Sequence, residues 1–237
     1  MPSAPLPRFL AGFLLYLSLL VSALWLAWQL LVPVNFAYPL AYEVLDIDQH
    51  VATFGPQNRY KNDFALTTAR EQKRLFGEIV KAIQHDGKGL REIAYTTTGG
   101  QTHTLLREAE AVHLQDVANL ITLLDRASWV CLAILAGTLA FIRHRNMPAP
   151  RGKQILLGAG GFLLTVGVIL LAFGPTQTFY WLHTQIFPED HEWFFYYQDS
   201  LMTTLMKAPD LFGFIAGLWG LVAIALFGLG HWIVQSG

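Results

Sequence analysis

Long apolar runs alternate with polar segments along the chain. The first run covers residues 9–32 and contains no charged side chain. At about 1.5 Å per residue it is long enough to cross a hydrocarbon core of about 30 Å, so we expect a membrane-spanning helix that ends at Pro33. Three later apolar runs predict further spans at residues 127–143, 154–175 and 210–234.

Two polar segments and one short basic loop separate these spans. The first polar segment covers residues 33–126, and the second, at 176–208, is a loop dense in aromatic side chains. The loop at 144–153 carries basic and no acidic side chains, which places it in the cytoplasm. We therefore predict a mostly α, polytopic membrane protein with four transmembrane helices, both termini cytoplasmic, and a mainly helical extracytoplasmic subdomain between helices 1 and 2.

Within the first polar segment, the spacing of apolar residues predicts two helices. Leu75, Phe76, Ile79 and Val80 form a helical stripe, so we expect a helix over residues 69–84, capped by Thr67 or Thr68. A second helix covers residues 107–124 and continues into the second span. Residues 35–55 contain many turn formers and are expected to be partly extended.

Composition supports the membrane assignment and excludes several functions. Hydrophobic residues make up 53% of the 237-residue chain and charged residues 14%, with mean hydropathy +0.38, as expected of an integral membrane protein. A net charge of −1 gives no reason to expect a nucleic-acid partner. Cys131 is the single cysteine, so no disulfide forms within the chain. No HExxH, GxSxG or P-loop motif is present.

Candidate chemistry gathers at two places next to the predicted spans. Glu110, His113 and Asp116 share one helical face, where carboxylates one turn away can orient an imidazole. His183 lies among aromatic side chains in the second polar segment. A solvated helix and an interfacial aromatic belt are the alternatives that need no chemistry, and a metal site at His113, Asp116 and His183 lacks diagnostic spacing. The other histidines are expected in loops or on the cytoplasmic side, His191 as a loop residue.

These residues resemble the lipoprotein intramolecular transacylases, a family of four-span membrane proteins. The resemblance rests on Glu110, His113, Asp116 and Val117 before the second span, and on Trp181, His183, Phe187, Trp193, Asp199 and Leu201 before the fourth. It extends over essentially the whole chain, with a large first and a short aromatic second outer loop.

The resemblance implies an enzyme that moves the sn-2 acyl chain of a diacylglyceryl-cysteine to its own α-amine, giving lyso-form lipoprotein. His113 would be the base and His183 would protonate the leaving glycerol oxygen, although the two roles are exchangeable. Glu110 and Asp116 would orient His113, Asp199 would partner His183, and Trp181 would support the site.

The same resemblance implies no cofactor, lipoprotein N-termini and membrane lipid as partners, and a site on the extracytoplasmic face of a bacterial inner membrane. A non-enzymatic membrane protein that binds a protein partner is the alternative, and it predicts that His113 and His183 lie far apart. A transporter is disfavoured because the predicted spans contain almost no ionisable groups.

Overall fold

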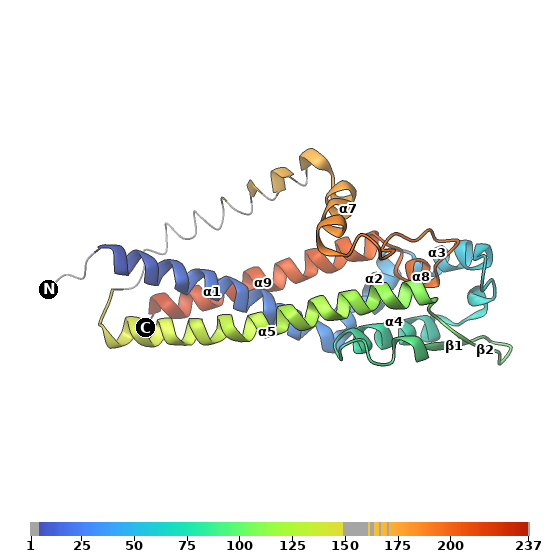
Figure 1. The fold of residues 1–237 in the computed structure, drawn as a ribbon, viewed down its shortest axis with the longest axis horizontal. Coiled ribbons are helices and arrows are strands. Elements are labelled where there is room, and N and C mark those ends of the chain that lie inside the picture. Colours follow the sequence, from blue (N-terminus) through green and yellow to red (C-terminus); the bar gives the residue numbers. More distant parts are fainter. Residues whose placement is uncertain (1–4, 149–160, 162–163, 166, 170, 237) are drawn as a thin grey trace. The chain divides into compact units, whose positions relative to one another are not determined.

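The computed structural model describes residues 5–148, 161, 164–165, 167–169 and 171–236, and these ranges are mostly helical (Figure 1). The chain forms two compact units. The span unit comprises Met1–Leu30, Leu124–Pro175 and Leu218–Gly237, and the polar unit comprises Leu31–Leu123 and Thr176–Gly217.

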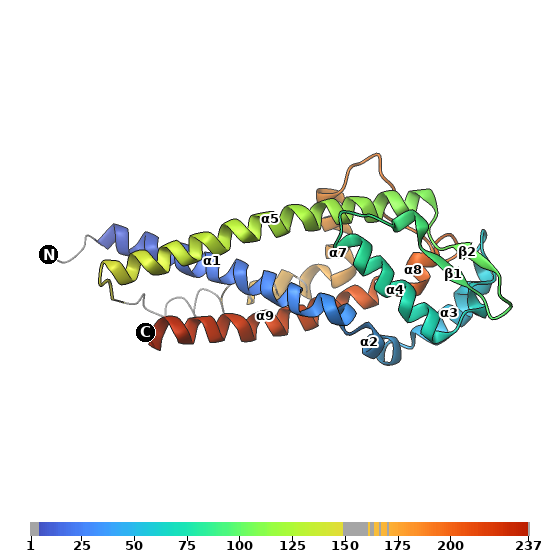
Figure 2. The same ribbon diagram turned by 90° about the horizontal axis from the view of Figure 1, so that it is seen from below.

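Helices of the span unit match three of the four predicted spans. In Figures 1 and 2, α1 (Pro5–Leu31), the second part of α5 (Glu108–His144) and α9 (Asp210–Ser236) lie side by side. Segments within Phe9–Val44, Glu108–His144 and Asp210–Ser236 are long and apolar enough to cross a membrane. Half of the expected third span, and Arg151 and Lys153 of the basic loop, lie outside the described residues.

Apolar and polar contacts both join the helices of the span unit. The core consists of Leu15, Tyr16 and Leu19 from α1, packed against Leu135, Leu139, Ile142, Phe227 and Val234. Asp125 Oδ1 accepts hydrogen bonds from Trp25 Nε1 at 2.9 Å and from Gln29 Nε2 at 3.1 Å. These two bonds join polar side chains of α1 to a carboxylate of α5, a kind of contact that helps helices associate in an apolar medium.

Helix α5 is longer than a membrane span requires, and its acidic residues near His113 lie at its N-terminal end. Its 37 residues extend for about 55 Å, nearly twice the thickness of a hydrocarbon core of about 30 Å. Residues 127–142 carry no charged side chain, whereas Glu108, Glu110 and Asp116 all lie in the first three turns. The first turns of α5, with His113, therefore extend beyond the membrane-spanning part. The predicted continuity of the His113 helix with the second span is confirmed.

Beyond α1, the chain turns sharply and forms two short helices. The turn η1 (Val32–Ala37) contains residues at φ of 49°, 53° and 56° from Asn35 to Ala37. Helices α2 (Tyr38–Val44) and α3 (Ile47–Phe54) follow, so the expected extended backbone at residues 35–55 was wrong. The buried side chains of α2 are Tyr38, Ala41 and Tyr42, whose spacing is that of a helical face.

The predicted helix at 69–84 is α4 (Ala69–Ile83). Thr68 Oγ1 accepts a hydrogen bond from the Glu71 amide at 3.2 Å, which confirms the expected cap. The turn after α4 has Gly87 at φ +77°, and a Cβ there would lie 2.1 Å from Oε1 of Gln115 on α5. Glycine is favoured here because this φ lies in the left-handed region, and a side chain would also displace the Gln115 amide.

The remaining elements complete the polar unit. Short turns η2 (Gly55–Gln57), η3 (Phe64–Leu66) and η4 (Leu90–Glu92) precede an antiparallel hairpin of β1 (Ala94–Thr96) and β2 (Thr102–Thr104), in which Tyr95 pairs with His103. Helices α7 (Pro175–Ile186) and α8 (Leu201–Met206) lie in the segment expected to be an aromatic loop, which corrects that prediction. Figure 2 shows α8 among α3 and α4, which it contacts.

Candidate active site

Glu110 connects the start of α5 to the start of α8 through hydrogen bonds. Its side chain is fully buried. Oε2 accepts a hydrogen bond from the Arg107 amide at 2.6 Å, which satisfies one of the free donors at the helix N-terminus. Oε1 accepts from Ser200 Oγ at 2.5 Å and from the Met202 amide at 3.2 Å. One carboxylate thus joins segments about ninety residues apart.

His113 lies one turn after Glu110, inside a cage of aromatic rings. The centroid of its ring is 6.1 Å from that of His183, 5.0 Å from Phe187 and 6.1 Å from Phe195. The side chain is buried, and its Nδ1 has no hydrogen-bond partner in the described part of the chain. A buried polar atom without a partner is costly in a purely structural role.

His183 comes from α7, and its own helix fixes its orientation. Nδ1–H donates to the carbonyl oxygen of Phe179 at 2.8 Å, four residues earlier. In the neutral ring this bond places the proton on Nδ1, so Nε2 carries the free lone pair. The rings of Phe179 and Trp193 lie at centroid distances of 4.0 and 4.9 Å and enclose the imidazole.

Burial acts on the two imidazoles to different degrees. It lowers the pKa of His113 to about 4, with a further decrease from His183 beside it and a partial opposing effect of Asp116. Burial also lowers the pKa of His183, while the bond to the Phe179 carbonyl opposes this shift. Both rings are therefore neutral near pH 7, and each has a nitrogen that can accept a proton.

Asp116 binds a histidine that the sequence did not single out. His191 Nδ1–H donates to Asp116 Oδ2 at 2.6 Å, and the pair joins α5 to the segment between α7 and α8. This carboxylate raises the pKa of His191. Asp116 also lines a cavity of about 230 Å³ whose other walls include Leu120, Leu123 and Phe187. Since Phe187 also contacts both imidazoles, the cavity adjoins them.

Three supporting residues differ from their expected roles. Glu110 binds Ser200 and the backbone rather than orienting His113, and Asp116 reaches His113 only through its charge. Asp199 pairs with Arg59 at 3.1 Å instead of with His183. Trp181, on α7, is 61% exposed. These partners come from distant segments, so spacing along one helix was no guide to them.

Two residues of the site were missed in the sequence. The position of Ser200 before Leu201 and Met202 is a helix N-cap signal, and its hydroxyl does accept from the Thr203 amide at 2.9 Å. Nothing local distinguishes His191 from an ordinary loop histidine, because its partner lies 75 residues away.

The arrangement bears on the two alternatives to acid-base chemistry. A partner-binding protein was expected to hold His113 and His183 far apart, yet their rings are neighbours. Within the described ranges, no three side chains of His, Cys, Asp or Glu are placed to hold a metal ion.

Comparisons with known proteins connect this geometry to one family. The family model described as lipoprotein intramolecular transacylase Lit matches residues 13–208. The fold resembles two solved variants of the membrane-integral lipoprotein intramolecular transacylase Lit from Bacillus cereus, each substituted at one histidine of that protein. Both are 15% identical in sequence to this chain, and the TM-scores are 0.65 and 0.66. The matches cover 97% of this chain and 91% and 92% of the two Bacillus chains. Curated proteins give no sequence match.

The family match covers most of the chain, and the likeness in fold extends over nearly all of it. We conclude that the chain belongs to the lipoprotein intramolecular transacylase family.

Proposed function

We propose that this protein moves the sn-2 acyl chain of a diacylglyceryl-cysteine to the α-amine of the same cysteine, so that a bacterial lipoprotein takes its lyso form. Family membership supports acyl transfer of this general kind. The observation that carries the proposal is the pair of neutral imidazoles, with ring centroids 6.1 Å apart, enclosed by aromatic side chains.

His183 is the better proton acceptor of the two. The α-ammonium group, with a pKa of about 8, must lose a proton before it attacks an ester. His183 has its lone pair on Nε2 and is the less buried ring, so it accepts that proton more readily than His113. This assignment takes the second of the two role assignments that the family resemblance left open.

His113 acts as a neutral hydrogen-bond donor in this scheme. Its low pKa keeps the ring uncharged, and a neutral imidazole has one ring N–H, which donates to the carbonyl oxygen of the ester. A donor held in a dry site strengthens its interaction as negative charge develops on that oxygen. An imidazole N–H is suited to this role because it stays neutral throughout the reaction.

The proposed reaction balances without an external acyl donor. His183 removes a proton from the ammonium, and the free amine attacks the ester carbonyl carbon to form a tetrahedral intermediate. As the carbon–oxygen ester bond breaks, the protonated His183 gives its proton to the glycerol oxygen. The ring, neutral again, takes the second proton from the nitrogen as the amide forms and then releases it to water. Ester and amine belong to one molecule, so their proximity is largely built in.

The surroundings of the histidines fit a lipid substrate. The cavity of about 230 Å³ beside Phe187 has mostly apolar walls, which suit part of an acyl chain. Leu120, Leu123 and Leu124 follow one another along α5, and Asp125 and Arg126 separate them from the uncharged stretch at 127–142. We place the site at the extracytoplasmic face of a bacterial inner membrane, where lipoprotein N-termini and membrane lipid meet.

The direct test is mass spectrometry of a lipoprotein N-terminal peptide. The protein is expressed in a host whose lipoproteins carry only diacylglyceryl-cysteine. We expect the total mass to stay unchanged while one acyl chain becomes resistant to mild base as an amide. His183→Ala should slow product formation by about 10²–10⁴-fold, and His113→Ala by about 10²–10³-fold.

His144→Ala provides the matched control. His144 is exposed in the last turn of α5, so this variant should keep full activity at equal expression. If the wild-type protein leaves both acyl chains base-labile, the proposed reaction is wrong. Equal losses in all three variants would contradict the assigned pair of histidines.

A further inference from the structure

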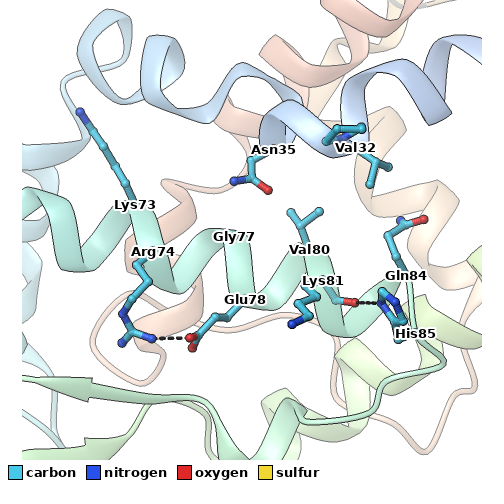
Figure 3. Close-up of a pocket in the computed structure, with 11 residues that line it drawn as sticks. Val32, Asn35, Lys73, Arg74, Gly77, Glu78, Val80, Lys81, Gln84 and His85 are labelled. Atoms are coloured by element: carbon cyan, nitrogen blue, oxygen red, sulfur yellow. Dashed lines mark hydrogen bonds and ion pairs between the residues drawn. The ribbon is translucent and has the colours of Figure 1, made fainter.

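Of two cavities in the polar unit, the smaller one borders the site. The larger, of about 470 Å³, lies between η1 and α4, where Arg74 pairs with Glu78 (Figure 3). It shares no residue with the cavity of about 230 Å³ that adjoins the two imidazoles. Asp116 lines this smaller cavity from α5, and Pro188 lines it from the chain just after α7. Its shape therefore depends on how that part of the chain is held against α5.

Residues 188–196 form an irregular loop, without helix or strand, that encloses the two imidazoles. The ring centroid of Trp193 lies 4.9 Å from that of His183, and the centroid of the buried Phe195 ring lies 6.1 Å from that of His113. The loop thus supplies one wall beside each imidazole. His113 is only 8% exposed, so an ester carbonyl reaches it only when part of its surroundings moves.

One polar contact ties this loop to the rest of the unit. Among the described residues, the bond from His191 Nδ1–H to Asp116 Oδ2, at 2.6 Å, is the single hydrogen bond or ion pair that joins residues 188–196 to another element. The other contacts of the loop with α7 are between aromatic rings, such as those of Trp193 and Phe194 with Tyr180. The position of the loop against α5 therefore depends on the pair of Asp116 and His191.

This pair can separate without disturbing its surroundings. The His191 side chain is 35% exposed and that of Asp116 15%, and ion pairs near the surface add little to overall stability. The chain is held separately on both sides of the loop. The Phe187 amide donates to the His183 carbonyl at 3.0 Å, and the Arg59 amide donates to the Gln198 carbonyl at 2.8 Å. Separation of the pair therefore releases the loop alone.

The charges around His191 favour its protonated form. Asp116 faces it from α5, while Glu189, Asp190 and Glu192 accompany it in the loop. The hydrogen bond to Asp116 raises the pKa of His191, and the charges of Asp116 and Asp190 act in the same direction. A hydrogen bond between two charged groups is stronger than one with a neutral donor. The bond is therefore strongest below this raised pKa and weakens as the pH rises through it.

We propose that Asp116 and His191 are a positioning pair for the acyl transfer proposed above, on which this inference rests: their bond holds the 188–196 loop over the two imidazoles, and its separation admits the diacylglyceryl-cysteine. With the pair formed, Trp193 and Phe195 enclose the rings during transfer. With the pair separated, the smaller cavity widens at its Pro188 wall. The pair acts on the reaction through the loop, and neither side chain touches the reacting atoms.

The first arm of the test measures loop opening without substrate. The purified full-length protein in detergent is treated with a protease that cleaves after glutamate, and mass spectrometry follows the cuts after the exposed Glu189 and Glu192. Asp116→Ala breaks the pair and leaves the cleaved sequence intact. Below pH 6.5, the ordinary pKa of histidine, we expect cleavage about fivefold faster than in the wild-type protein. This ratio, which cancels the protease's own pH dependence, should fall toward one as the pH rises through the pKa of His191.

Glu108→Ala is the matched control for this arm. It removes one exposed negative charge from the same helix, at a residue that pairs with Arg91 instead of with the loop. Loop cleavage in this variant should equal that of the wild-type protein. Equal acceleration in Glu108→Ala and Asp116→Ala, or a ratio for Asp116→Ala that does not change with pH, would overturn the pair as the contact that holds the loop.

The second arm measures initial rates of acyl transfer in variants of His191, which keep the charge of Asp116 beside His113. His191→Gln should lower the rate severalfold, because the closed loop is populated less. His191→Arg retains a cation that can bind Asp116 and should restore most of the rate. A rate in His191→Gln that is unchanged or higher, or a loss that His191→Arg does not restore, would overturn the positioning role. If the wild-type protein transfers no acyl chain, the proposed reaction fails, whereas the cleavage arm still decides whether the pair holds the loop.

Discussion

Two histidines that look equivalent in the sequence differ in burial and in hydrogen bonding. His183 is held by the Phe179 carbonyl and remains partly accessible, whereas His113 is buried with an unpaired Nδ1. In the proposed reaction, this difference makes His183 the proton acceptor and His113 the neutral donor, because the environment can set two like groups to different tasks.

The first prediction concerns the pH dependence of acyl transfer. His183 must be neutral to accept a proton, and burial lowers its pKa from the usual 6.5. The rate should therefore fall on acidification with a midpoint below pH 6.5, because activity is lost only as pH drops through the folded-state pKa. Initial rates between pH 4.5 and 7 test this, a range in which the substrate amine stays protonated. A midpoint above pH 6.5 would contradict His183 as the acceptor.

The second prediction concerns the buried carboxylate of Glu110. Glu110→Ala leaves the donors of Ser200, Met202 and Arg107 without their acceptor. We expect a loss of about 3 kcal/mol in the free energy of unfolding, seen as a decrease in Tm of about 5–10 °C. The matched variant Glu108→Ala, which removes an exposed ion pair with Arg91, should leave Tm nearly unchanged. Equal effects of the two would show that Glu110 has no special structural role.

At the level of helices, close packing between α1 and α9 depends on one glycine. A Cβ at Gly230 would lie 2.6 Å from Cδ1 of Leu19, whereas a Cβ at Gly228 would meet no atom within 4 Å. The two positions therefore differ in their neighbours while sharing one helix.

The third prediction uses this pair of glycines. Gly230→Ala forces the Leu19 side chain out of its place and should destabilise the protein by about 1 kcal/mol, at the low end for overpacking because a side-chain end can move. Gly228→Ala should leave stability unchanged or slightly raised, since alanine favours helices. Thermal unfolding in one detergent measures both. Equal Tm values for the two variants would contradict the contact between α1 and α9.

The helices of the chain were predictable to the extent that their pattern is local. Apolar runs identified α1, α9 and the spanning part of α5, and the stripe from Leu75 to Val80 identified α4. Helices α2, α3, α7 and α8 were missed because they are short, with burial that depends on distant segments. The same reason applies to the site: His113 and His183 were identified, but the partners of Glu110, Asp116 and Asp199 come from residues 75 to 140 positions away.

At the scale of the whole molecule, the remaining prediction is topology. With four spans and the basic loop inside, both polar segments face outward, and the single Cys131 makes this testable by labelling. In a Cys131→Ser background, Lys88→Cys and Glu189→Cys should react with a membrane-impermeant maleimide in intact cells. Arg145→Cys should react only after the membrane is permeabilised. Labelling of Arg145→Cys in intact cells would show that the orientation is the reverse of the predicted one. Labelling of only one of the two outer positions would rule out four spans.

The bond between Glu110 and Ser200 also has a consequence for how the protein is made. A ribosome synthesises α5 about ninety residues before it reaches Ser200 and Met202, so the carboxylate of Glu110 emerges long before two of its three donors. Until then, water must solvate this carboxylate, and the aromatic cage around His113 lacks Phe187 and Phe195. A nascent chain that stops before residue 200 therefore cannot assemble the site, and the histidines gain their final environment only when the last quarter of the protein has been inserted.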